Sequence, residues 1–66
     1  MAKVAHVGTA RKAFTDLTGA LEDATLIATE GQSTRDLAAA RQSCDRLIGR
    51  LNACLRQLQR LRRRLE

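Results

Sequence analysis

Apolar residues recur every three or four positions along most of the chain, which places them on one side of an α-helix. Counting in sevens from Val7 as position a makes positions a and d apolar in the first half, and counting from Leu37 does the same in the second. A pattern sustained in this way predicts helices that pack as in a coiled coil. The first half has Val7, Phe14, Leu21 and Ala28 at a, Ala10, Leu17 and Ala24 at d, and Ala13, Ala20 and Ile27 at g; the second has Leu37, Cys44, Leu51, Leu58 and Leu65 at a, Ala40, Leu47, Cys54 and Leu61 at d, and Ile48 and Leu55 at e.

The larger of these side chains are expected to pack helix against helix. In the second half the e residues widen the apolar stripe beyond what one partner helix covers. The predicted packing and interface residues are Val7, Phe14, Leu17, Leu21, Leu37, Cys44, Leu47, Ile48, Leu51, Cys54, Leu55, Leu58 and Leu61.

The segment EGQSTRD, residues 30–36, separates the two periodic halves. Gly31 suits the left-handed position that ends a helix. Ser33 or Thr34 can cap the next helix, and Asp36 favours its first turn through the helix dipole. These signals predict a helix over about residues 3–30, a loop over 31–33 and a helix over about 34–65. So short a loop makes the chain an all-α, antiparallel two-helix hairpin in a single domain, residues 1–66. A single uninterrupted helix is the alternative.

The first helix is expected to be the less stable of the two. Gly8 and Gly19 each cost about 1 kcal/mol relative to Ala in a helix. The five threonines of this half add smaller penalties because their side chains branch at Cβ. We therefore expect this helix to depend on packing for its stability.

The length and composition of the chain indicate a helical protein that needs a partner. Among its 66 residues there is no Pro, Trp or Tyr, and Phe14 is the single aromatic. Chains below about 70–80 residues rarely obtain more than ~3–5 kcal/mol from a single core. A two-helix hairpin also leaves its apolar stripe half covered. We therefore expect a homodimer that forms a four-helix bundle, or a bundle completed by a helix of another protein.

Charge is distributed unevenly along the chain, which has a net charge of +5. Residues 1–30 carry three Lys or Arg against four Asp or Glu, and residues 31–66 carry nine Arg against three acids. In a hairpin, the arginines of LRQLQRLRRRL, residues 55–65, would share one end with the basic residues of the first helix. Either the acidic loop end of a second chain or an external anion would relieve this charge. The candidate contacts to an anion or to nucleic acid are Arg11, Lys12, Arg56, Arg60, Arg62, Arg63 and Arg64.

No set of residues indicates catalysis, a cofactor or a metal site. His6 is the sole histidine, and no serine or cysteine has a motif that would pair with it. The acids show no paired-carboxylate spacing, and no glycine-rich phosphate loop is present. Cys44 and Cys54 lie ten residues apart, about 15 Å along a helix, which is too far for a disulfide between them. Both are expected to be small core residues. We predict a protein that is not an enzyme and has no small-molecule substrate.

No apolar run in the sequence is long enough to span a membrane. The opening, MAKVAHVGTARKAF, lacks the apolar block of a secretory signal, although its basic, acid-free composition leaves an organelle presequence as an alternative. We expect a soluble, cytoplasmic protein. The final Leu65-Glu66 is a dipeptide that commonly precedes a purification tag, so Glu66 is given no role.

The pattern predicts a non-enzymatic helical-hairpin interaction and oligomerisation module. The alternative is a small basic bundle that binds nucleic acid through the arginine-rich end of its second helix. Base stacking would contribute little there, because Phe14 is expected in the core. In architecture alone, the hairpin resembles the Rop proteins of plasmid copy control, which dimerise into four-helix bundles and bind paired RNA hairpins. Small helical co-chaperones of bacterial secretion systems are similar in size and shape.

Overall fold

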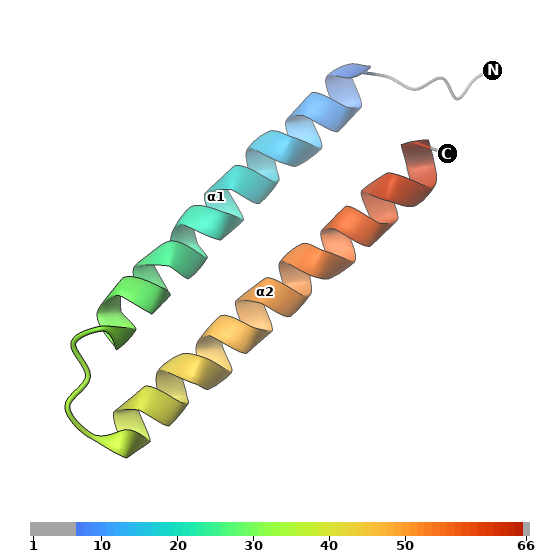
Figure 1. Cartoon of the computed structure of the whole chain (residues 1–66). Helices are drawn as coiled ribbons and strands as arrows, with labels where there is room; N and C mark the ends of the chain where they lie inside the picture. The colour runs from blue at the N-terminus through green and yellow to red at the C-terminus, as the bar shows by residue number, and fades with distance from the viewer. Residues whose placement is uncertain (1–6, 66) are drawn as a thin grey trace.

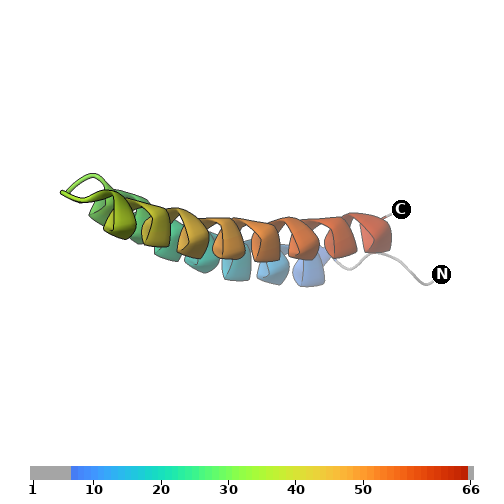
Figure 2. The same cartoon turned by 90° about the horizontal axis from the view of Figure 1, so that it is seen from below.

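The computed structural model, which describes residues 7–65, consists of two helices that lie side by side and run in opposite directions (Figure 1). Helix α1 is Val7–Gly31 and helix α2 is Leu37–Leu65. Seen from below, the pair forms one gently curved layer (Figure 2). The predicted all-α hairpin is confirmed, and the alternative of one uninterrupted helix is wrong. The residues expected to begin the first helix before Val7, with His6 among them, lie outside the described range.

The end of α1 differs from the sequence prediction. Gly31 is the last helical residue, and no glycine among residues 7–65 has a positive φ angle. The chain instead tightens into successive turns, in which the Ser33 amide donates to the Glu30 carbonyl at 3.1 Å and the Thr34 amide donates to the Gly31 carbonyl at 3.2 Å. These bonds satisfy the last carbonyls of the helix, so a left-handed glycine is not needed.

The cap of α2 is Asp36 rather than Ser33 or Thr34. The Asp36 carboxylate accepts a hydrogen bond from the Ala39 amide at 2.8 Å, and the Asp36 carbonyl accepts the first helical bond from the Ala40 amide at 3.1 Å. The Thr34 hydroxyl is engaged elsewhere, on the Gly31 carbonyl at 3.0 Å. Helix α2 therefore begins at Leu37, not near residue 34. A carboxylate is well suited to this position because it satisfies an amide and also interacts favourably with the helix dipole.

Four threonines of α1 satisfy their hydroxyls within their own helix. Each hydroxyl donates to the carbonyl four residues earlier, at 2.9–3.0 Å. Such bonds add little stability and tend to bend a helix. These threonines are Thr15, Thr18, Thr25 and Thr29.

The two helices meet along a line of mostly small side chains, which we call the seam. In α1 the buried and half-buried residues fall at positions d and g, not at a and d. Position a is exposed, because alanines at d and g allow α2 to approach closely and leave the larger a side chains at the side of the contact. The seam consists of Ala10, Ala13, Leu17, Ala20, Ala24, Ile27 and Gly31 in α1, and of Ala39, Ala40, Ser43, Leu47, Ala53, Cys54 and Leu61 in α2.

The core of the hairpin is small. Only Leu17, Ala24, Ile27, Cys54 and Leu61 are buried among the described residues, and none of their side chains is fully enclosed. Truncating a buried Leu or Ile in a normal core costs about 2–5 kcal/mol, so a seam with three large buried side chains supplies modest stability by itself.

The cap at Asp36 gives a direct test of how α2 begins. Asp36→Ala should lower the free energy of unfolding by about 1 kcal/mol, because it leaves the Ala39 amide without its partner. Thermal unfolding followed by circular dichroism measures this loss. Asp45→Ala is the matched control, since Asp45 is exposed within α2 and away from its ends. Equal losses in the two variants would contradict the assignment of Asp36 as the cap.

Candidate interaction surface

Nine apolar side chains that the seam leaves uncovered make up what we call the apolar face. Its large members are each 38–61% exposed, including Phe14 at 50% and Leu51 at 45%. Cys44 is exposed as well. The apolar face consists of Val7, Phe14 and Leu21 from α1, and Cys44, Ile48, Leu51, Leu55, Leu58 and Leu65 from α2.

These side chains lie on the same side of the hairpin because of helix geometry. With about 100° between successive residues, position a lies about 90° around the helix from the middle of the d/g seam. Because α1 and α2 run in opposite directions, this rotation carries position a towards the same side of the molecule in both helices. In α2 position e lies next to a, so Ile48 and Leu55 widen the face.

The opposite side of the hairpin, which we call the polar face, carries ion pairs between the helices. Arg46 of α2 lies 3.5 Å from the Glu30 carboxylate of α1, and Arg50 donates to the Asp23 carboxylate at 3.2 Å. Glu30 and Asp23 both occupy position c, on the far side of the seam from position a. These pairs were not predicted from the sequence, although the spacing of seven between Asp23 and Glu30 places both acids on one side of α1.

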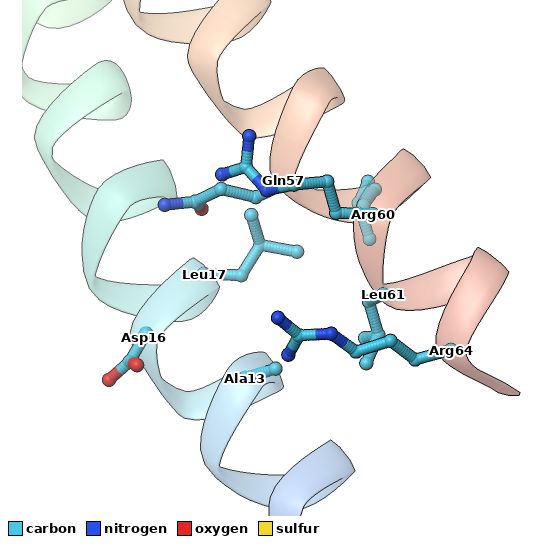
Figure 3. Close-up of a pocket in the computed structure, with 8 residues that line it drawn as sticks. Ala13, Asp16, Leu17, Gln57, Arg60, Leu61 and Arg64 are labelled. Atoms are coloured by element: carbon cyan, nitrogen blue, oxygen red, sulfur yellow. The ribbon is translucent and has the colours of Figure 1, made fainter.

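No further ion pair joins the two helices, among the described residues, at the end of the hairpin opposite the turn. We call this end, residues 7–19 and 56–65, the open end. There Gln57, Arg60 and Arg64 extend from α2 across Leu17 and Ala13 of α1 (Figure 3). They line a cavity of about 200 Å³, together with Leu58, Leu61 and Asp16.

The acid nearest to these arginines is engaged with another base. Asp16 accepts from Lys12 one turn earlier, at 3.2 Å. Among residues 7–65, neither Arg60 nor Arg64 forms an ion pair. Two guanidinium groups on the polar face are therefore available to an external anion.

The candidate anion contacts all lie exposed at the open end. Residues 7–19 and 56–65 together contain seven basic residues and one acid, whereas residues 20–55 contain four basic residues and five acids. The molecule is strongly positive at the open end and close to neutral over the rest of its length. The basic residues of the open end are Arg11, Lys12, Arg56, Arg60, Arg62, Arg63 and Arg64.

The structure places all but one of the expected interface residues either in the seam or on the apolar face. Leu17, Cys54 and Leu61 are buried in the seam and Leu47 is half-buried there. Leu37, at the start of α2, is 87% exposed. The others lie on the apolar face, where their role in association stays a prediction: Val7, Phe14, Leu21, Cys44, Ile48, Leu51, Leu55 and Leu58.

Two of the expected core residues lie outside the core of the single hairpin. Phe14 and Cys44 are both exposed, because position a does not lie in the seam. Cys54, at position d, is buried as expected. Phe14 nevertheless lies on the apolar face, whereas Arg60 and Arg64 lie on the polar face, so it does not offer a stacking surface beside them.

The remaining chemistry of the described residues is limited. Residues 7–65 contain no group of three or more His, Cys, Asp and Glu side chains that could hold a metal ion. Within the same range, neither helix combines the length and apolar character that crossing a membrane requires. Cys44 and Cys54 are free thiols.

Comparison of the chain with models of protein families, with curated proteins and with solved structures finds no match. The function is therefore inferred from the two faces of the hairpin.

The ion pairs on the polar face should contribute much less to stability than the seam. A double-mutant cycle with Asp23→Asn and Arg50→Gln should give a coupling energy of about 0.2–1 kcal/mol that shrinks with added salt, because both side chains are at least half exposed. Ile27→Ala, which truncates a side chain only 4% exposed, should cost about 2 kcal/mol or more. Urea unfolding followed by circular dichroism measures both. A coupling energy larger than the cost of Ile27→Ala would contradict this order.

Proposed function

We propose that this protein is a non-enzymatic interaction module, whose apolar face packs against further helices to complete a helical bundle. The observation that carries the proposal is that nine apolar side chains lie uncovered on one side of a hairpin whose other side is charged. Contiguous apolar patches larger than a few hundred Å² are rare on monomeric proteins and mark binding surfaces.

The composition of the seam supports the same proposal, because it limits the stability of the hairpin alone. Half of its members are alanines, while most of the large apolar side chains lie outside it. Burial of apolar surface contributes roughly 25 cal/mol per Å², so the exposed parts of these side chains represent hydrophobic stabilisation that the hairpin alone does not obtain. Packing the apolar face against other helices would supply it.

The difference between the two faces also determines on which side of the hairpin further helices are expected to pack. Other helices are expected against Leu51 and Leu58, and not over Arg46 and Arg50, whose charges are already paired with acids of α1. Covering those pairs would require removing them from water, which is unfavourable unless the partner supplies equivalent hydrogen bonds.

Leu51→Asp tests the proposal at the centre of the apolar face. An unpaired carboxylate buried between helices is strongly unfavourable, so the variant should lose association and with it most of its helicity. Sedimentation equilibrium and circular dichroism measure the two effects.

Leu26→Asp is the matched control. Leu26 is 62% exposed and lies at position f, away from the apolar face. This control should change neither association nor helicity. A Leu51→Asp variant that keeps both properties would contradict the proposed role of the apolar face.

A second candidate function is supported by the open end of the polar face. Arg60 and Arg64 extend into the same cavity without an acidic partner among the described residues. Guanidinium groups bind phosphates through paired hydrogen bonds, and release of counterions makes such binding dependent on salt. We propose that, if this protein binds nucleic acid, it does so here and through the phosphate backbone. The polar face stays accessible when the apolar face is covered, so the two functions are compatible.

The double variant Arg60→Gln with Arg64→Gln tests this second candidate. It should leave the helicity intact, weaken binding to double-stranded nucleic acid at low salt, and reduce the salt dependence of log K by about two units. Fluorescence anisotropy over a series of salt concentrations measures this change.

Arg35→Gln with Arg41→Gln is the matched control, because it removes the same charge near the turn. The control should retain the greater part of the affinity and of the salt dependence. Equal effects in both double variants would show that net charge, and not the open end, determines binding.

A further inference from the structure

We infer that the apolar face is covered by the same face of a second copy of this chain, in a two-fold dimer that sets the turn of each hairpin beside the open end of the other. This inference rests on the proposed function and adds to it the identity and the direction of the partner. The functional form of the protein is then a four-helix bundle made of two chains.

The α2 part of the apolar face is complementary to itself when one copy is reversed. In a two-fold interface each residue near the axis meets its own copy, and the others meet residues at equal distances on the far side. Leu51 is the midpoint of α2, and Cys44 and Leu58 lie seven residues to either side of it. A two-fold axis at Leu51 therefore places the small Cys44 of each chain opposite the larger Leu58 of the other, and Ile48 close to Leu55.

Charge determines the direction of the second copy. A parallel dimer would place two open ends together, each with seven basic residues and one acid. The antiparallel dimer places each open end beside the turn of the other copy. Residues 20–55, which include the turn, contain four basic residues and five acids. Charges within about 10 Å of one another are only partly screened at ordinary salt, so the parallel arrangement is unfavourable.

One contact at the edge of the face opposes this choice. Arg41 and Arg62 both occupy position e, near opposite ends of α2. In the antiparallel dimer, Arg41 approaches Arg62 of the second copy. Two-fold symmetry repeats this approach once, and the two like-charge approaches are a small cost beside the repulsion between two open ends.

The apolar face offers a second copy eight large side chains that are each 38–61% exposed. No charged side chain belongs to the apolar face, so its burial leaves no unpaired charge.

The exposed Cys44 reports the direction of the second copy. With the axis at Leu51, the two Cys44 residues lie about 21 Å apart along the bundle, far beyond the separation that a disulfide spans. In a parallel two-fold dimer the axis runs along the bundle, so the two Cys44 residues would lie at the same level of it. The test uses Cys54→Ala, which leaves Cys44 as the only thiol, and the same variant with Leu58→Cys added. Both are oxidised by dissolved oxygen with copper phenanthroline and analysed on a non-reducing gel.

The antiparallel dimer predicts opposite results for these two variants. Cys54→Ala alone should run as a single chain, and the variant with Leu58→Cys should run as a covalent dimer in which mass spectrometry finds a link between residues 44 and 58. Cys54→Ala with Leu26→Cys is the control for random collision and should not cross-link. If Cys54→Ala fails to fold, Cys54→Val provides the same background with a bulkier apolar side chain in the seam.

Sedimentation equilibrium of the unmodified, reduced protein is measured alongside. A dimer together with the link between residues 44 and 58 would support the inference. A disulfide between two Cys44 residues would overturn the direction, and an assembly larger than a dimer would overturn the two-fold arrangement.

Two further outcomes separate this inference from the proposed function. A helical monomer that binds an apolar dye would overturn the second copy as partner, while leaving the apolar face free for a helix of another protein. A dimer that Leu51→Asp does not disrupt would overturn both, because the interface would then lie elsewhere.

Discussion

The close contact of α1 and α2 through small side chains is the constraint on which the rest of the structure depends. Alanines at positions d and g of α1 let α2 approach, and this contact rotates both helices so that their large apolar residues lie to one side. Phe14 and Leu51 are exposed for this reason and not because the helices fail to pack. The hairpin thus leaves most of its larger apolar side chains uncovered on one side.

The same rotation separates the chemistry of the two faces. It brings Asp23 and Glu30 of α1 beside Arg50 and Arg46 of α2, where they form two ion pairs between the helices. At the open end no ion pair joins the two helices among the described residues, because Asp16 pairs with Lys12 within α1. Hydrophobic association on one side and anion binding on the other can therefore occur in the same molecule.

Local hydrogen bonding explains the differences around the turn. The sequence contains several residues that can end or begin a helix between Glu30 and Asp36, and each has a similar intrinsic preference for its role. Asp36 becomes the cap because its carboxylate reaches the Ala39 amide, while Thr34 is held by the Gly31 carbonyl. Which of these competing bonds forms depends on the path that the chain takes to bring α2 beside α1, and this path is a tertiary property.

By itself, the sequence determined two helices, their antiparallel pairing and an apolar stripe wider than one partner can cover, because the heptad spacing and the short turn act locally. It did not determine which part of that stripe becomes the seam. Positions g, d and a are adjacent around a helix and all three are apolar in α1, so periodicity alone cannot rank them. The tertiary structure decided in favour of d and g, because two helices pack most closely where their side chains are small.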